Sequence, residues 1–477
     1  MKPTPVIAVF DIGKTNKKLF LFNEQYQSEF ERTTRFSETM DEDGDPCEHL
    51  ESLRLFILDS LRDVAAMEQF DVKAVNFTAY GASFVYTDID GEPLTPLYNY
   101  LKPYPQTLQQ ELYSTHNGEA LFAQETASPA LGSLNAGLQL FRLKKERPAL
   151  FSKLQYALHL PQYLGYLVTG KAFSDLTSIG CHTALWDFSK QQYHQWTSQE
   201  NILEKLAPIA AHDQVHPVKN GISKKLIQSG IGLHDSSSAL IPYLLSFPEP
   251  FVLISTGTWS ISLHPFNNTP LTREELQQDC LCYLSWEGRP VKASRLFAGQ
   301  FHEDQVKRIA AFFGQQVSRY NHIPPDRNIL RLLSSVSKQE QATSSETYPP
   351  SLQFDNRDLK DFEDDITAYH QLMLDIVNAQ VQSTELLLKA APVKTIYVDG
   401  GFSRNELFMH LLSIHFPQHD IYAASMAQAT AIGAALAIHK YWNSGPLPED
   451  LIATQLYAIT DFNVSPETRN DSTVQDS

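Results

Sequence analysis

The stretch VIAVFDIGKTNKKLFLF, residues 6 to 22, decides the fold. An unbroken apolar run extends from Val6 to Phe10, and a second one from Leu19 to Phe22. Short apolar runs bounded by turn residues are typical of buried strands, so the stretch predicts a hairpin with DIGKTN at its turn. Asp11 stands where the first strand meets that turn. Because an unpaired buried carboxylate costs several kcal/mol, Asp11 must either cap its own turn or act in a cleft.

Bulk composition limits the classes of function. The 477 residues suffice for about two or three domains. A net charge of −17 disfavours nucleic acid as a partner, since phosphate binding needs a basic surface. The sequence shows neither a signal peptide nor an apolar run long enough for a membrane span, so we expect a cytoplasmic protein without a membrane partner. The four cysteines lack CxxC or zinc spacing and the histidines lack HExxH, which predicts reduced thiols and no transition-metal site.

Several further elements are predicted in the first half of the chain. The pattern indicates a helix over 47–67, a strand over 72–81 that ends in a glycine turn, and a mostly helical stretch over 134–170. The acidic residues between 41 and 45 surround Gly44, and such a charge run predicts a solvated loop.

The opening pattern returns in the second half. A glycine-containing loop leads into a helix after Asp235, with Ser236 and Ser237 as further N-cap candidates. Prolines then punctuate the chain and predict a domain boundary near residue 245. FVLISTGTWSISLHPF (251–266) repeats the layout of strand, glycine turn and returning strand. Such turns can present backbone N–H groups to phosphate, although either one alone is more often a plain hairpin.

A third signal is VKTIYVDGGFSRNELFMHLLSIHF (393–416). A strand ends in the Asp-Gly-Gly turn at 399–401, and Ser403 with Glu406 has the pattern of a capping box that opens a helix. A glycine turn at a helix N-terminus suits a nucleotide phosphate, but it is also an ordinary strand-to-helix connection. The alanine-rich stretch 427–441 predicts another helix, in which Gly433 permits close packing.

Taken in order, these segments resemble the FGGY family of carbohydrate kinases, which belongs to the actin-like ATPase superfamily. FDIGKTNKK is similar to the family's first phosphate motif, STGTWS to its second, GLHDSSSAL to the loop with the catalytic aspartate, and DGGFSRNELFMHLLS to the adenosine motif. LPQYLGYLVTGKAFSDLTSIGCHTALWDF (160–188) resembles a helix and hairpin of the sugar-binding lobe. The His-Asp pair at 234–235 is most similar to the corresponding segment of rhamnulose kinases and their relatives.

The resemblance implies an α/β fold in which two actin-like (ribonuclease H-like) lobes face each other across a nucleotide and sugar cleft. We expect an N-terminal lobe over 1–245 with the sugar site and first phosphate hairpin, an ATP-binding C-terminal lobe over 246–462, and a polar tail over 463–477 that is disordered. ATP and Mg²⁺ are the implied cofactors, and the partners are a small sugar and ATP. Whether the chain forms a homodimer is left open.

The resemblance also implies roles for particular residues. Asp235 is the implied catalytic base and, with Asp11, the implied magnesium-side carboxylate. The implied nucleotide contacts are Gly13, Thr15, Asn16, Lys17, Thr256, Gly257, Thr258, Gly400, Gly401 and Asn405. The implied substrate contacts are Gly81, Ala82, His234 and Asp235. Read alone, the HDSS string more often marks a helix N-cap, and His234 either contacts the sugar or packs beside the loop.

Three departures from the family pattern concern the sugar and the nucleotide. Lys14 stands where many members have a small hydroxyl residue, LYNYLKPYP (97–105) where members often carry an Asp/Arg sugar contact, and Gln428 where a glutamate is usual. The leading hypothesis is therefore an ATP-dependent kinase for a ketose that is rhamnulose-, fuculose- or xylulose-like. Its alternatives are an actin-like ATPase and a catalytically silent sugar-binding protein. A glycosidase is conceivable, although nothing in the sequence places two carboxylates at a defined separation.

Overall fold

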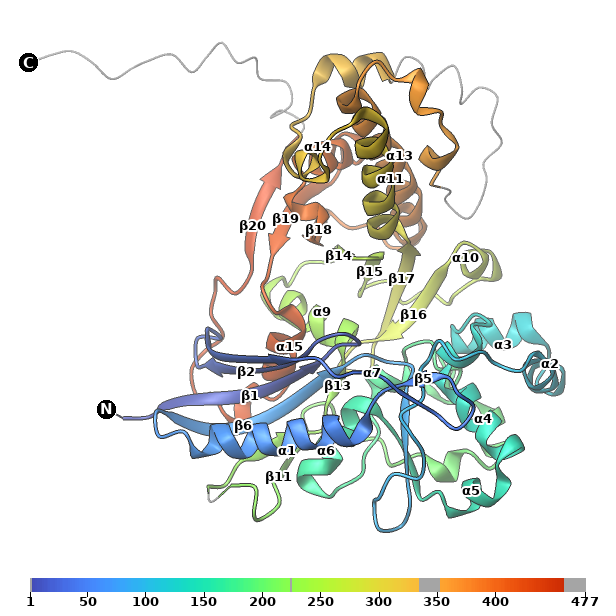
Figure 1. Ribbon diagram of the computed structural model, residues 1–477, viewed down its shortest axis with the longest axis vertical. Helices are drawn as coiled ribbons and strands as arrows, with labels where there is room; N and C mark the ends of the chain where they lie inside the picture. The colour runs from blue at the N-terminus through green and yellow to red at the C-terminus, as the bar shows by residue number, and fades with distance from the viewer. Residues whose placement is uncertain (1, 224, 334–351, 459–477) are drawn as a thin grey trace, which may run out of the picture. The chain divides into compact units, whose positions relative to one another are not determined.

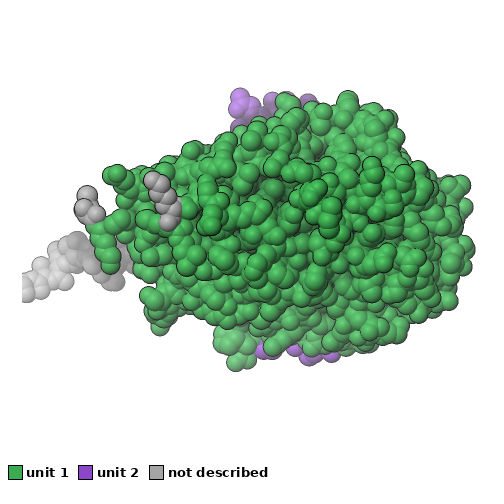
Figure 2. All heavy atoms as spheres, turned by 90° about the horizontal axis from the view of Figure 1, so that it is seen from below, with its two compact units in different colours: residues 1–249, 265–293, 426–452 green, residues 250–264, 294–425, 453–477 purple. Residues whose placement is uncertain are grey.

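The computed structural model describes residues 2–223, 225–333 and 352–458 (Figure 1). The chain divides into two compact units, which Figure 2 distinguishes by colour. Unit 1 comprises Met1–Glu249, Pro265–Ala293 and Met426–Ile452, and unit 2 comprises Pro250–His264, Ser294–Ser425 and Ala453–Ser477. The predicted polar tail over 463–477 lies outside the described residues. Within the described ranges, no helix has the length and apolar character that crossing a membrane requires.

Unit 1 is built on a twisted sheet with the strand order β11-β12-β6-β1-β2-β3, and β13 also pairs with β6. Its strands are β1 (Thr4–Ile12), β2 (Lys17–Asn23), β3 (Ser28–Thr34), β6 (Phe70–Ala79), β11 (Val215–Pro217), β12 (Gln228–Gly230) and β13 (Leu233–His234). β1 and β2 are antiparallel, whereas β6 runs parallel to β1, β12 and β13. The predicted hairpin over 6–22 and the predicted strand over 72–81 are confirmed.

Helices cover both faces of this sheet, which explains the unbroken apolar run from Val6 to Phe10. Every side chain of that run is fully buried. Val6, Ala8 and Phe10 lie in one core cluster with α1 (Leu50–Ala66) and α6 (Leu160–Thr169). Successive side chains of a strand point to opposite faces, and the other face of β1 is in contact with α15 (Ala429–Ala437). The predicted helix over 47–67 is confirmed as α1.

α15 packs closely against α9 (Asp235–Ser246) within unit 1. A Cβ atom added to Gly433 would lie 1.9 Å from the backbone oxygen of Ser238. The hydroxyl of Ser238 donates a 2.7 Å hydrogen bond to the backbone oxygen of Thr430. The close packing predicted for Gly433 is therefore confirmed, because only hydrogen fits between the two helices at this point.

The remaining part of unit 1 is mostly helical, with short strands between the helices. Its elements are β4 (Thr39–Met40), β5 (Pro46–Cys47), β7 (Phe84–Thr87), α2 (Gln106–Thr115), α3 (Glu119–Thr126), α4 (Ala136–Glu146), α5 (Pro148–Lys153), β8 (Tyr156–His159), α7 (Leu176–Ile179), β9 (Trp186–Asp187), β10 (Gln192–Tyr193), α8 (Gln195–Gln199), α10 (Arg273–Gln277) and β16 (Cys280–Leu284). The predicted mostly helical stretch 134–170 is confirmed as α4, α5 and α6, and the short strand β8 interrupts it. β8 pairs with β7, so its apolar residues belong to a buried strand and not to a helix face.

The acidic segment at 41–45 is not a simple solvated loop. Lys102 is only 9% exposed, and its ammonium contacts the carboxylates of Asp41, Asp43 at 2.8 Å and Asp45 at 3.3 Å. Asp41 is itself buried. The prediction is confirmed for the exposed Glu42, Asp43 and Gly44 but wrong for Asp41, because the charge run says nothing about a cation some 60 positions along the chain.

The second mixed sheet has the strand order β16-β17-β15-β14-β18-β19-β20, and unit 2 contains β14, β15, β18, β19 and β20. The strands are β14 (Phe251–Thr256), β15 (Ser260–His264), β17 (Pro290–Leu296), β18 (Thr395–Gly400), β19 (Asp420–Ser425) and β20 (Ala453–Tyr457). β14 is antiparallel to β15 and parallel to β18. The predicted hairpin over 251–266 is confirmed, and it repeats the topology of β1, β2 and β6 in unit 1.

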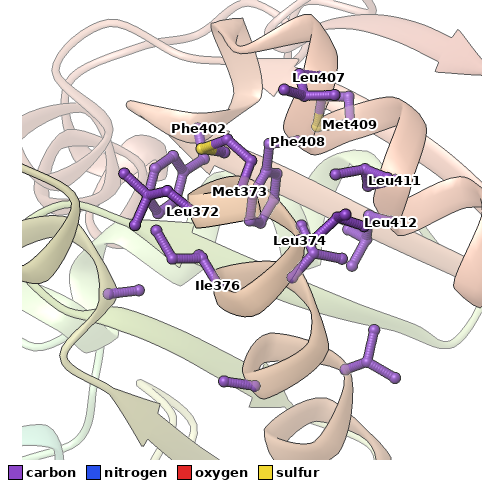
Figure 3. Packing of buried hydrophobic residues seen from close by; sticks show 14 of the residues in the cluster. Leu372, Met373, Leu374, Ile376, Phe402, Leu407, Phe408, Met409, Leu411 and Leu412 are labelled. Carbon is purple, nitrogen blue, oxygen red and sulfur yellow. The ribbon is translucent and has the colours of Figure 1, made fainter. Parts of the chain in front are cut away.

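The described residues of unit 2 also include the helices α11 (Ala298–Phe313), α13 (Asp365–Leu388) and α14 (Glu406–His415). Figure 3 shows apolar side chains of α13, among them Met373, meeting Phe408 and its neighbours on α14. The predicted Ser403–Glu406 capping box is wrong. Residues 402–404 form a single 3₁₀ turn, and the side chain of Asn405 instead caps α14 by accepting a 3.0 Å hydrogen bond from the Phe408 N–H.

Candidate active site

The candidate site residues of unit 1 gather at the carboxyl ends of the parallel strands β1, β6 and β13. Asp11 is the penultimate residue of β1, Gly81 follows the end of β6, and His234 ends β13. Asp235 comes next and begins α9. In open α/β sheets, ligands bind at this edge, because loops and helix N-termini meet there.

Asp11 is held in a mostly buried position by its neighbours in unit 1. Burial raises the pKa of the Asp11 carboxyl to about 6, and the negative charge of Asp235 acts in the same direction. A 2.8 Å hydrogen bond from the Thr430 hydroxyl and the positive charge of Lys18 oppose this rise in pKa. The two carboxylates therefore lie near enough to repel one another, an arrangement that a cation would relieve.

Asp235 presents a side chain that is 32% exposed at the first turn of α9. The helix N-cap is His234, whose side chain makes no capping hydrogen bond, so the alternative in which Asp235 is only an N-cap is wrong. Asp235 Oδ1 accepts a 2.6 Å hydrogen bond from the Ser236 N–H and lies 3.4 Å from His234 Nε2. The other carboxylate oxygen has no hydrogen bond among the described residues that would block a ligand.

His234 is buried between Asp235 and the turn after β6. Burial lowers the pKa of His234, against the opposing charge of Asp235, so the imidazole is neutral at neutral pH. A Cβ atom added to Gly81 would lie 2.8 Å from the His234 ring, so only glycine allows this approach. Ala82 has a φ of 59°, and its carbonyl accepts a 2.7 Å hydrogen bond from Gln139. Gly81, Ala82, His234 and Asp235 thus form one compact group, and their role as substrate contacts stays a prediction.

The first phosphate turn connects β1 to β2. It is closed by a 2.9 Å hydrogen bond from the Gly13 N–H to the Asn16 carbonyl, and Thr15 is exposed at its tip. The Asn16 side chain accepts a 2.7 Å hydrogen bond from Arg35. Lys17 is only 1% exposed, and its ammonium binds the carboxylate of Glu48 and the Lys14 carbonyl. The predicted phosphate contacts of Gly13, Thr15, Asn16 and Lys17 stay predictions.

Sequence reasoning missed Lys18, which is directly opposite Asp11 in the antiparallel register of β1 and β2. Opposed residues of a strand pair project from the same face, so Lys18, and not the buried Lys17, shares the face of Asp11. Its side chain is 34% exposed. The signal was present in the sequence, since alternation along β2 from the buried Leu19 and Leu21 already divides the two lysines between faces.

Two glycine turns of unit 2 are joined through Thr256. Its hydroxyl donates a 2.6 Å hydrogen bond to the Asp399 carbonyl and accepts one of 3.0 Å from the Phe402 N–H. A Cβ atom on Gly400 would lie 1.8 Å from the Thr256 carbonyl, which also accepts a hydrogen bond from the Gly401 N–H. The predicted second phosphate turn and the predicted adenosine turn therefore lie side by side within unit 2.

The exposed atoms of these turns are those that could reach a nucleotide. Gly257, Thr258 and Gly401 are exposed, whereas Thr256 is 6% exposed and already bonded. The N-terminus of α11 abuts the second turn, because a Cβ atom on Gly299 would lie 1.8 Å from the Gly257 carbonyl. Sequence reasoning missed Gly299. Asn405, besides capping α14, donates a 2.8 Å hydrogen bond to Tyr369, and its role as a nucleotide contact stays a prediction.

The donor set of unit 1 fits Mg²⁺. Mg²⁺ prefers oxygen ligands and is commonly bound by one or two carboxylates together with substrate phosphates and water. Asp11 and Asp235 are two such carboxylates, and the pKa of Asp11 is raised chiefly by burial, with the charge of Asp235 adding to the rise. Over the described ranges, no cluster of three or more His, Cys, Asp or Glu side chains could hold a metal ion without other ligands.

Comparison with known structures supports the fold. A carbohydrate kinase from Novosphingobium aromaticivorans is 22% identical, with a TM-score of 0.73 and coverage of 95% of this chain and 94% of that one. A ligand-bound xylulose kinase from Lactobacillus acidophilus is 13% identical, with a TM-score of 0.75 and coverage of 95% and 93%. These similarities confirm the predicted α/β fold with two actin-like lobes.

Curated relatives are similar over part of their length. A rhamnulokinase from Oceanobacillus iheyensis is 24% identical over 202 residues, which are 39% of this chain and 40% of that protein. A rhamnulokinase from Mannheimia succiniciproducens is 23% identical over 282 residues, which are 56% of this chain and 55% of that protein. The aligned stretches thus span between two fifths and just over half of these relatives.

Family models match both halves of the chain. Residues 6–241 match the N-terminal domain of the FGGY family of carbohydrate kinases, and residues 248–446 match the C-terminal domain of FGGY carbohydrate kinases. The two matches follow one another in the order that the motifs predicted, and they include every candidate site residue named above. The chain therefore belongs to the FGGY family of carbohydrate kinases.

Proposed function

We propose that the chain is an ATP-dependent kinase that transfers the γ-phosphoryl group to a hydroxyl of a ketose. The observation that carries this proposal is the group formed by Asp11, Gly81, His234 and Asp235 at the carboxyl edge of the unit 1 sheet. It combines a partly exposed carboxylate, a neutral histidine and a second carboxylate suited to a metal ion. These are the groups that phosphoryl transfer to an alcohol needs beside the nucleotide turns.

Asp235 is the proposed general base. Its side chain is partly exposed at the start of α9, and Oδ1 accepts the hydrogen bond from the Ser236 N–H. The other carboxylate oxygen can therefore accept the proton of the attacking hydroxyl. Neutral His234 can donate or accept a hydrogen bond to a sugar hydroxyl without adding charge. Gly81 keeps the space beside the imidazole open.

Charge on the transferring group requires compensation. Asp11 and Asp235 would hold Mg²⁺, which when bound neutralises phosphate charge and polarises the phosphoryl oxygens. Thr430 keeps Asp11 in place through its hydrogen bond. Lys18 shares a face of the hairpin with Asp11, and we assign its ammonium to the nucleotide phosphates.

The backbone turns are the proposed nucleotide contacts. In unit 1, the turn that begins at Gly13 is a proposed phosphate contact. In unit 2, the exposed turn at Gly257 and Thr258 and the adjoining Gly400–Gly401 turn are proposed contacts of a nucleotide. Glycine lets the backbone approach phosphate closely, and successive N–H groups suit an anion. The bonds through Thr256 hold the two turns of unit 2 in a fixed relation before the nucleotide arrives.

The proposed acceptor is a ketose of the deoxy-hexulose or pentulose kind. The GLHDSSSAL and STGTWS segments support it, together with relatives named rhamnulokinase and a similar structure named xylulose kinase. Lys14 and the segment 97–105 depart from the family pattern beside this group, so they are where a difference in sugar preference would originate.

An acceptor panel tests the proposal. ADP release is measured with rhamnulose, fuculose, xylulose, ribulose and glycerol, each with ATP and Mg²⁺, and the products are identified by mass spectrometry. We expect one ketose to give ADP and a sugar phosphate in equal amounts. Hydrolysis of ATP that no sugar stimulates would favour an actin-like ATPase, and turnover of glycerol alone would contradict the ketose assignment.

A further inference from the structure

Glu48 joins the two lysines of the first phosphate turn in the interior of unit 1. The residue is only 6% exposed and immediately follows β5. Its carboxylate lies 3.0 Å from the ammonium of Lys17, which also donates a 2.8 Å hydrogen bond to the Lys14 carbonyl across the turn. The ammonium of Lys14 lies 3.3 Å from the same carboxylate, as an ion pair without hydrogen-bond alignment. One carboxylate thus fixes both lysines.

Glu48 also contacts the segment 97–105, which lies beside the candidate acceptor group. The Glu48 N–H donates a 3.2 Å hydrogen bond to the carbonyl of Leu97, and the two residues form an antiparallel bridge. Leu97 begins the segment 97–105, which contains Tyr100. Burial raises the pKa of Tyr100, and the charges of Asp235 and Glu48 raise it further, so the phenol lies near both carboxylates.

Aromatic rings complete the connection between the turn and the candidate acceptor group. The Lys14 ammonium lies 5.8 Å from the ring centroids of both Tyr80 and Tyr100. These two rings pack edge to face at 5.9 Å. Tyr80 directly precedes Gly81, and its backbone N–H donates a 3.2 Å hydrogen bond to the carbonyl of Ile12 in β1. Contacts of this kind are specific in geometry, because the cation must lie over the ring faces.

We propose that Glu48 is a positioning residue that couples nucleotide binding at the first phosphate turn to acceptor binding beside Asp235. Phosphate binding changes the turn and so moves Lys14 and Lys17. Both ammonium groups are paired with the carboxylate of Glu48, whose backbone N–H is bonded to Leu97 of the segment 97–105. Buried ion pairs add little to stability over apolar replacements, so such a network is better understood by what it orders. The inference rests on the proposed kinase function and names the path by which its two substrates affect each other.

The coupling is reciprocal by thermodynamic necessity. If bound nucleotide raises the affinity for the acceptor sugar, the bound sugar raises the affinity for nucleotide by the same factor. Typical factors are roughly 5–150-fold. A residue that only stabilises the fold would change both affinities or the stability, but not this factor. The factor is therefore the property to measure.

The experiment compares Glu48→Gln with the matched control Glu38→Gln. Both remove one negative charge near Lys14, but Glu38 lies 3.6 Å from that ammonium with a side chain that is 50% exposed, and it does not contact Lys17. The dissociation constant of the most active ketose from the acceptor panel is measured by calorimetry with and without a nonhydrolysable ATP analogue and Mg²⁺. The coupling factor is the ratio of the two constants.

We expect the unaltered protein and Glu38→Gln to show the same coupling factor, about tenfold or more, and Glu48→Gln to reduce it to near one. Sugar affinity without nucleotide should change by less than about threefold. An unchanged factor in Glu48→Gln, or no coupling in the unaltered protein, would overturn the inference.

A second variant protects the test against misfolding of Glu48→Gln. Lys14→Met keeps the Glu48–Lys17 pair but removes the Lys14 ammonium, with its ion pair to Glu48 and its contacts with the two tyrosines, so it should lower the coupling factor while Lys17 stays paired. If no ketose is phosphorylated by the unaltered protein, the proposed function fails and not the coupling alone. If a ketose is phosphorylated and neither variant changes the factor, only the coupling fails.

Discussion

Thr430 donates a 2.8 Å hydrogen bond to the carboxylate of Asp11, which lies 419 positions earlier in the chain. Both residues belong to unit 1, because the segment 426–452 returns to the first sheet. The bond orients a carboxylate that burial otherwise disfavours in its charged form. The close approach of α15 to α9 at Gly433 is what brings Thr430 within reach of β1.

The first prediction concerns magnesium and pH. Because the pKa of Asp11 is raised to about 6, the carboxyl is increasingly protonated below that pH and binds a cation less well. The Mg²⁺ concentration for half-maximal rate should therefore rise as the pH falls from about 7.5 to about 5.5. Asp11→Asn keeps the acceptor for Thr430 but should raise that concentration at pH 7.5 by at least about tenfold and remove its dependence on pH.

The raised pKa of Asp11 also makes the stability of the metal-free protein depend on pH. In the metal-free protein, the stability that protonated Asp11 contributes is fully present below the ordinary aspartate pKa of 3.8 and is lost as the pH rises through about 6, the pKa in the folded protein. Asp63→Asn, which removes a surface ion pair with Arg32, serves as the control. It should change neither the Mg²⁺ concentration for half-maximal rate nor the pH dependence of stability. Identical magnesium curves for Asp11→Asn and the unaltered protein would contradict the metal assignment.

The second prediction concerns Gly81. A methyl group there would meet the imidazole of His234 at 2.8 Å, so Gly81→Ala should displace His234 and raise KM for the ketose by about tenfold or more, with KM for ATP nearly unchanged. The cause is steric, so the substitution should have little additional effect in a His234→Ala background. Steady-state kinetics of the two single variants and the double variant measure this, and additive effects would argue against the contact.

The third prediction concerns the helix pair α9 and α15. Gly433→Ala places a methyl group 1.9 Å from the backbone oxygen of Ser238, which cannot move without its helix. We expect a loss of about 1–3 kcal/mol in the free energy of unfolding, measured by urea denaturation. Ala429→Ser, at the partly exposed start of the same helix, is the control and should change stability by less than about 0.5 kcal/mol. Equal stability of the two variants would contradict the packing argument.

The strands of the fold were predictable because their apolar runs are strong local signals. The hairpins at 6–22 and 251–266 could be read directly, since runs such as Val6 to Phe10 are buried on both faces. The strand β8 inside a helical stretch was not predictable, because its pairing with β7 is a contact distant in sequence. The helix start at Asn405 instead of Ser403 was decided by the 3₁₀ turn that precedes it.

The candidate site was predictable where a motif names its residues, and less so where side-chain direction matters. Asp11 and Asp235 could be named from their motifs, but the Thr430 bond to Asp11 joins opposite ends of the chain. The motif indicates Lys17, whereas strand alternation turns Lys17 inward to Glu48 and places Lys18 on the face of Asp11. The ion pairs of Lys102 with the 41–45 segment likewise depend on tertiary packing.

We propose that Asp235 accepts the proton of a ketose hydroxyl as the phosphoryl group leaves ATP. Asp235→Asn keeps the size of the side chain and the acceptor for the Ser236 N–H, but cannot take up that proton. The measurement is the rate at which ADP and sugar phosphate form together at saturating ATP, Mg²⁺ and ketose, for the unaltered protein and for Asp235→Asn. We predict equal amounts of the two products from the unaltered protein, and a kcat lower by at least about a hundredfold in a variant that still folds and binds both substrates. Near-normal turnover by Asp235→Asn would contradict the role of Asp235 as the general base.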